Sequence, residues 1–303
     1  MGAIGLGCMG MTFAYDSDQR DDTTSIAVIH RALELGATLL DTADVYGPWT
    51  NEELVGRALV GRRESAVVAT KCGIVHSPDF NHGRVASPAY VRSACDASLT
   101  RLGIETIDLY QLHRVDPATP IEETWGAFAG LVESGKARAV GLSEVTLDEL
   151  RRCHAIHPVA SVQSELSLWT RDWADDVLPF CRENDIAFLP FSPLGRGFLT
   201  GALAATQFAD DDYRSKLPRF SSESMAANQA IVDQVRSIAT AYDATPAQVA
   251  LAWVLAQGDL VIPIPGTKRV SRLEENAAAA DLTLTPDDLA TLDALPTPTG
   301  SRY

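Results

Sequence analysis

Four side chains suited to proton transfer follow three successive apolar runs of the sequence. Asp41 and Tyr46 lie in DTADVYG, Lys71 in VVATKCG and His113 in IDLYQLHRVDP. A tyrosine phenol, with a pKa near about 10, donates its proton poorly at neutral pH. A nearby ammonium stabilises the phenolate and lowers that pKa, a carboxylate holds the ammonium, and an imidazole orients a carbonyl oxygen. The set can protonate an oxygen while another group delivers a hydride.

These positions must be brought together by the strands that precede them. Apolar runs of the kind that form strands buried on both faces predict eight strands, at Ala3–Gly7, Thr38–Leu40, Ala66–Ala69, Ile107–Leu112, Arg138–Leu142, Val159–Val162, Ile186–Phe191 and Leu260–Ile264. Helical patterns lie between them at Thr24–Leu35, Ser87–Leu102, Ile121–Ser134, Met225–Tyr242 and Thr245–Gln257.

This alternation, without a linker rich in Pro, Gly or Ser, predicts one (β/α)8 TIM barrel domain over residues 1–303. A doubly wound parallel sheet is the alternative that the strand count leaves open. In a barrel, polar residues just after the strands face one common mouth. The four proton-transfer residues would therefore converge there.

Composition and charge argue against several classes of protein. The formal net charge is −15 and no long Lys/Arg run exists, so we expect neither a nucleic-acid partner nor an anionic membrane. Five scattered cysteines without a Cys-x-x-Cys pair indicate neither a disulfide framework nor a zinc site, and His154 and His157 have no evident third ligand. With no signal peptide and no long apolar run, we expect a cytoplasmic, metal-free protein. Nothing predicts its oligomeric state.

The stretch GLGCMG at residues 5–10 matches the glycine pattern of a dinucleotide-binding turn. Only four residues precede it, and the polar stretch after it, MTFAYDSDQRDDTT, does not open a helix. The first acidic strand end, Asp41, lies too far along to be the ribose ligand. We interpret GLGCMG as the first barrel strand and its turn, not as a phosphate cradle.

Nearly the whole chain resembles the aldo-keto reductase family, in particular its bacterial NADP(H)-dependent oxidoreductases. The stretches that carry the resemblance include LLDTADVYG, NEELVGRAL, VVATKCG, VQSELSLWTRD, FSPLGRGFLTG and IPIPGTKRVSRLEENAAAA, in the order of the family. The resemblance implies reduction of small aldehydes or ketones to alcohols, with Tyr46 as proton donor. Lys71 and Asp41 would tune Tyr46, and His113 would position the substrate carbonyl.

The resemblance also implies a nicotinamide cofactor across the barrel mouth. Ser143 and Gln163 match positions that hold its carboxamide, and Ser192, Leu194, Gly195 and Arg196 match the loop around its pyrophosphate. The adenosine end would be held by Gly266, Thr267, Lys268, Arg272, Glu275 and Asn276. A basic group at a helix start, formed by Lys268, Arg269 and Arg272, suits a 2′-phosphate and favours NADP(H) over NAD(H).

Two departures from the family pattern stand out. The chain begins almost at its first strand, so we expect the N-terminal hairpin that caps the barrel bottom in most members to be missing. Many relatives have Asn where this chain has Glu144, which cannot donate an amide hydrogen to the carboxamide.

The substrate is not identified by the sequence. Trp49 and Tyr15 are candidate walls of the substrate pocket, with packing roles as the alternative. A cofactor-binding redox sensor or regulatory subunit with little turnover is the alternative function, because such subunits of the family can keep the same four residues.

Overall fold

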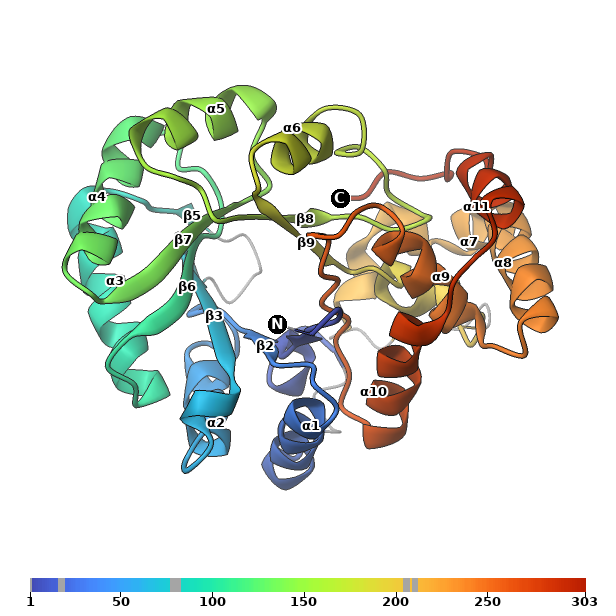
Figure 1. Ribbon diagram of the computed structural model, residues 1–303, viewed down its shortest axis with the longest axis horizontal. Coiled ribbons are helices and arrows are strands. Elements are labelled where there is room, and N and C mark those ends of the chain that lie inside the picture. The colour runs from blue at the N-terminus through green and yellow to red at the C-terminus, as the bar shows by residue number, and fades with distance from the viewer. Residues whose placement is uncertain (1, 16–19, 77–82, 204–207, 209–211) are drawn as a thin grey trace.

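The computed structural model describes residues 2–15, 20–76, 83–203, 208 and 212–303. Seven parallel strands pair in a row to form most of a ring, with helices outside it (Figure 1). In order of pairing they are β1 (Leu6–Gly7), β2 (Leu39–Asp41), β3 (Val67–Cys72), β6 (Ile107–Leu112), β7 (Ala137–Ser143), β8 (Ser161–Glu165) and β9 (Ala187–Phe191). The predicted barrel architecture is confirmed, and GLGCMG supplies β1 and the 3-10 turn η1 (Met9–Met11).

The eighth predicted strand, Leu260–Ile264, does not form a regular strand, although it occupies the eighth place in the ring. Its backbone joins β9 through hydrogen bonds from Ile262 N to Phe188 O and from Ile264 N to Pro190 O, both close to 3 Å. The carbonyls of Pro263 and Pro265 accept from the backbone N–H groups of Gly5, directly before β1, and of Gly7 in β1. Because proline has no N–H, the segment cannot build a full ladder. Isolated bridges close the ring instead.

Helices cover the outer face of the ring (Figure 1). Those of the first two thirds of the chain are α1 (Asp22–Glu34), α2 (Thr50–Ala58), η3 (Arg63–Ser65), α3 (Pro88–Leu102), α4 (Ile121–Glu133), α5 (Leu147–Ile156) and α6 (Val177–Glu183). Those of the last third are η4 (Gly195–Thr200), η5 (Tyr213–Lys216), η6 (Pro218–Phe220), α7 (Ser222–Ala227), α8 (Gln229–Ala241), α9 (Pro246–Leu255), α10 (Val270–Ala277), η7 (Ala278–Asp281) and α11 (Pro286–Asp293). A small antiparallel pair, β4 (Ile74–Val75) with β5 (Gly83–Arg84), follows β3. None of the helices in the described ranges has the length and apolar character needed to cross a membrane.

The helix ends follow from local sequence. Ser87 caps α3, whose first residue is Pro88, and Thr146 with Glu149 forms a capping box at α5. The single predicted helix Met225–Tyr242 is wrong, because it divides into α7 and α8 at Asn228. The Asn228 side chain instead accepts from Thr299 N and donates to Thr299 O, at 2.8 and 2.9 Å, and so fixes the C-terminal segment.

Two apolar layers result from the alternation of side chains along each strand. The larger lies between strands and helices and includes Val68, Leu112 and Trp125. The smaller fills the barrel interior and includes Leu39 and Ala69. This inner layer determines which polar residues can face the mouth.

Candidate active site

The inner faces of the strands carry the polar residues of the mouth. Leu39 and Ala69 belong to the interior core, and Asp41 and Lys71 lie two positions further along the same strands. Because side chains alternate with a period of two, each polar residue points to the same side as its apolar predecessor. His113 follows β6 directly, and its backbone N–H donates to the backbone carbonyl of Cys72 at 2.8 Å. The three residues are thereby gathered at the carboxyl ends of β2, β3 and β6.

A buried ion pair lies at the centre of this group. The Lys71 Nζ atom is 2.7 Å from Asp41 Oδ2 and also donates to Thr42 O at 2.6 Å. The other carboxylate oxygen, Asp41 Oδ1, accepts from Gln163 Nε2 at 2.7 Å. Burial alone would lower the pKa of Lys71, but Asp41 and Tyr46 outweigh it and raise that pKa. The ammonium is therefore charged at neutral pH.

Tyr46 lies between this ion pair and His113. Its ring centroid is 5.1 Å from Lys71 Nζ and 5.8 Å from the His113 ring, which meets it edge-on. Burial raises the pKa of Tyr46, and Lys71 lowers it without cancelling the effect of burial. Lys71 therefore acts in the predicted direction, and burial sets the net direction. The phenol is protonated over the physiological pH range, as a proton donor must be.

One cleft of about 590 Å³ is lined by Tyr46 and His113 together with the loops that follow β1 and β9. The segment of residues 260–266 that closes the ring, here called the closing segment, and the residues after it line the cleft as well. Gly195 sits in a sharp turn of the loop after β9, at φ +56°, and a Cβ there would come within 2.8 Å of Trp169 Cε3. Only glycine avoids both the left-handed strain and this clash. Arg196, next along, has φ +53° and lines the cleft.

Comparison with known proteins assigns the chain to a family. The profile of the Aldo/keto reductase family matches residues 3–296. The chain belongs to the aldo/keto reductase family. It is 46% identical to the "Probable aldo-keto reductase 1" of Glycine max over 99% of this chain and 88% of that protein. As an aldo/keto reductase it is an oxidoreductase, and its family interconverts carbonyl and alcohol groups.

Solved structures of similar proteins agree with this assignment. A glycerol dehydrogenase from Gluconobacter oxydans is 32% identical with a TM-score of 0.88, over 99% of this chain and 94% of that one. An aldo/keto reductase from Klebsiella pneumoniae, solved in complex with NADP and acetate, is 28% identical with a TM-score of 0.74, over 99% and 94% of the two chains.

Most of the residues predicted for the site of this aldo/keto reductase line one cleft. They are Tyr15, Asp41, Tyr46, His113, Ser143, Gln163, Ser192, Leu194, Arg196, Gly266, Thr267, Lys268, Arg272, Glu275 and Asn276. Lys71 lies behind Tyr46 with a fully buried side chain, and Gly195 supports the loop without lining the cleft. Trp49 is not among the lining residues. It precedes α2 with φ +67° and is 55% exposed.

The cleft of this reductase also contains residues that sequence reasoning missed. Arg114 donates to Ser143 Oγ at 3.0 Å, and Phe13 stacks on Tyr46 with centroids 6.1 Å apart. Tyr213 and Tyr303 line the cleft as well, from segments far along the chain. Arg114 directly follows His113, so its position after a strand was a usable signal. Phe13 and the two tyrosines lie outside strand ends, and no local pattern marks them.

Asp44, in the loop that carries Tyr46, is expected to make the stability of this aldo/keto reductase depend on pH. Burial is the main cause that raises the pKa of Asp44 to about 8, and the charge of Glu52 adds to it. An aspartate in the unfolded chain has a pKa of about 4. The folded protein thus keeps a proton that the unfolded chain releases between these pH values. The free energy of unfolding should fall as pH rises through that window.

Asp44→Asn should remove this dependence, because the amide resembles the protonated carboxyl group in shape. Urea unfolding at pH 5 and pH 8 measures it. We expect the loss of stability between the two to be larger in the wild type by at least about 1 kcal/mol. Equal losses in the two proteins would contradict a proton held at Asp44.

Proposed function

We propose that this chain reduces aldehydes or ketones to alcohols with NADPH, and that Tyr46 is the general acid. The observation that carries the proposal is the buried Asp41–Lys71 ion pair, whose ammonium lies 5.1 Å from the centroid of the Tyr46 ring. A buried cation beside a phenol in a cleft stabilises the phenolate that proton donation leaves behind. The edge-on imidazole of His113 supplies a polar contact for a carbonyl oxygen.

The residues of the cleft suit a dinucleotide phosphate. Tyr46 and His113 line one continuous cleft with the basic residues Lys268, Arg269 and Arg272. The last two flank the start of α10, where unpaired backbone N–H groups also favour an anion. We propose that Ser143 and Gln163 hold the carboxamide. The pyrophosphate would lie on the loop of Ser192, Leu194, Gly195 and Arg196, and the adenosine end on Gly266, Thr267, Lys268, Arg272, Glu275 and Asn276.

In this proposal the bound nicotinamide supplies the hydride, and the chain's own residues manage the proton. His113 orients the carbonyl oxygen toward the phenol. Tyr46 donates its proton to that oxygen, and the Lys71 ammonium balances the charge on the resulting phenolate. Asp41 fixes the ammonium, and Gln163 fixes Asp41 from strand β8, which does not pair with β2. Arg114 donates to the Ser143 hydroxyl and would hold it in place for the carboxamide.

We also propose that residues 1–303 form one domain. Support comes from the closing segment, which joins β9 to β1 and carries cleft residues such as Gly266. The cleft therefore uses both the first and the last parts of the chain.

A two-step experiment tests the function. The protein is first titrated with NADPH and NADH by tryptophan fluorescence, and a panel of aldehydes and ketones is then added while NADPH absorbance is followed. We expect tighter binding of NADPH and carbonyl-dependent oxidation. Tight binding without turnover on any carbonyl would instead favour a redox sensor or regulatory subunit. No binding of either nucleotide would overturn the proposal.

Lys268→Ala is expected to weaken NADPH binding by about 10- to 100-fold, as for loss of a charge-assisted hydrogen bond, while NADH binding changes less than about threefold. The difference arises because only NADPH carries the 2′-phosphate. Dissociation constants from the same fluorescence titration measure it. Lys136→Ala, which removes a surface lysine paired with Asp96, is the control. Equal weakening of both nucleotides by Lys268→Ala would contradict 2′-phosphate recognition.

A further inference from the structure

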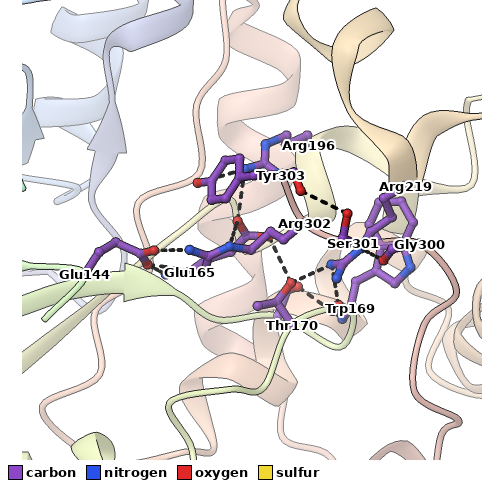
Figure 2. A network of polar contacts seen from close by, with 11 residues as sticks. Glu144, Glu165, Trp169, Thr170, Arg196, Arg219, Gly300, Ser301, Arg302 and Tyr303 are labelled. Atoms are coloured by element: carbon purple, nitrogen blue, oxygen red, sulfur yellow. Dashed lines mark hydrogen bonds and ion pairs between the residues drawn. The ribbon is translucent and has the colours of Figure 1, made fainter. Parts of the chain in front are cut away.

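Four charged side chains from distant parts of the chain meet beside the cleft (Figure 2). Glu144 follows β7, Glu165 ends β8, Arg196 lies in the loop after β9, and Arg302 lies near the C-terminus. The Arg302 guanidinium pairs with Glu144, and its Nε atom is 3.7 Å from Glu165 Oε2. Arg196 Nη2 is 3.0 Å from the same Glu165 oxygen. Glu165 therefore sits between two guanidinium groups.

This network is buried. The side chains of Glu165, Arg196 and Glu144 are 1%, 4% and 7% exposed, and that of Arg302 is 15% exposed. The two carboxylates pair directly with two guanidiniums, and a third guanidinium, that of the buried Arg219, reaches the network through Thr170, to which it donates at 2.8 Å. Because buried charges interact strongly, removal of any one would shift the net charge beside the cleft by one unit.

The carboxylates are held in place by further hydrogen bonds. Glu144 Oε1 accepts from Glu165 N at 3.0 Å, and Thr170 Oγ1 donates to Glu165 Oε1 at 2.9 Å. Glu144 adopts the left-handed φ of +54°, a conformation that costs a non-glycine residue about 1 kcal/mol. Its carboxylate thus turns to the guanidinium of Arg302 and to the backbone of β8. This accounts for an acid at the position after Ser143.

The network reaches the cleft through Arg196 and Tyr303, which both line it. The ring of Tyr303 covers both guanidiniums. Its centroid lies 5.3 Å from the Arg196 Cζ atom and 4.7 Å from the Arg302 Cζ atom. Without Arg302, Glu144 would lose its guanidinium partner, and Arg196 would be the remaining guanidinium that pairs directly with these carboxylates. The wall would then be more negative by one charge where an anionic ligand has to bind.

We propose that Arg302 is a positioning residue for the pyrophosphate of the cofactor, and that it acts by neutralising Glu144 and Glu165 so that Arg196 remains attractive to an anion. The inference rests on the proposed binding of NADP(H) in this cleft. It assigns to the C-terminal segment an electrostatic part in binding, in addition to the wall that Tyr303 forms.

Charge-changing variants test this through binding alone. Arg302→Gln leaves one excess negative charge and should weaken NADPH binding on the order of tenfold, as for a unit charge at short range in a partly buried site. Glu144→Gln leaves one excess positive charge and should tighten it severalfold. The double variant restores the net charge of the wild type, and its affinity should return to within about twofold of the wild type.

Adenosine 2′-monophosphate serves as the matched ligand, because it has the 2′-phosphate but no pyrophosphate. Fluorescence titration should give the same affinity for it in all four proteins. Arg152→Gln, which breaks an exposed ion pair with Glu122, should leave the affinity for both ligands unchanged. Melting temperatures measured without ligand show which variants are folded.

Three results would overturn the proposal. They are unchanged NADPH binding in Arg302→Gln, equal weakening of both ligands, and a double variant no better than Arg302→Gln. If Arg302→Gln does not fold, the tightening predicted for Glu144→Gln decides the matter, since mere structural damage would not strengthen binding. A wild-type protein that binds no NADPH would overturn the proposed function itself, and this inference with it.

Discussion

Replacing Tyr46 with phenylalanine is expected to lower kcat for carbonyl reduction by about 100- to 10,000-fold, the usual contribution of a general acid. NADPH binding should be unchanged, because the hydroxyl group is assigned to the substrate oxygen. The ring would keep its stacking on Phe13 and its place beside Lys71. Only the transferable proton would be lost.

Steady-state and single-turnover rates, together with a fluorescence titration, separate the two effects. Tyr242→Phe is the control, because it removes a phenol that bonds Asp288 outside the cleft. Turnover in Tyr46→Phe within about tenfold of the wild type would rule out Tyr46 as the proton donor. A matching loss of NADPH affinity would instead indicate damage to the cleft.

Lys71→Met is expected to abolish turnover and also to lower the free energy of unfolding by about 3–5 kcal/mol. Its side chain is fully buried and pairs with Asp41, which is 5% exposed. Loss of the ammonium therefore leaves a carboxylate buried without its counter-charge. Methionine fills a similar volume, so the cost is mainly electrostatic. Urea unfolding measures it.

A second substitution distinguishes stability from catalysis. Asp41→Leu combined with Lys71→Met replaces the whole ion pair with apolar groups, which often restores or raises stability. We expect the double variant to regain most of the lost free energy of unfolding and to remain inactive. If it also regained activity, the ammonium would not be the group that supports Tyr46.

The sequence predicted the architecture well where strands are apolar and continuous. The run Ile107–Leu112 forms β6 with the same bounds, because both faces of that strand are buried. The prediction failed at Leu260–Ile264, because Pro263 within the run and Pro265 directly after it lack the N–H donors that a ladder requires. It also failed at Asn228, where the chain divides into α7 and α8 and the side chain bonds Thr299, which is remote in sequence.

At the candidate site, too, the sequence predicted what local pattern determines and missed what tertiary packing determines. Asp41, Lys71 and His113 were found because strand ends place them by a simple alternation. The net direction of the Tyr46 pKa could not be found, because burial depends on the three-dimensional packing around the ring. The pairing of Arg302 with Glu144 also depends on tertiary structure, which brings the C-terminus back across the barrel.

The closing segment has a consequence for the order in which the barrel assembles. Gly5 and Gly7 bond to the carbonyls of Pro263 and Pro265, which lie almost a full chain length away. Contacts so distant in sequence carry the largest loop-closure entropy, so this joint should be the last to form and the first to open. Gly266, at the end of the joint, also lines the cleft. A dinucleotide bound there would stabilise the contact that closes the barrel, and would slow amide hydrogen exchange at Gly5 and Gly7.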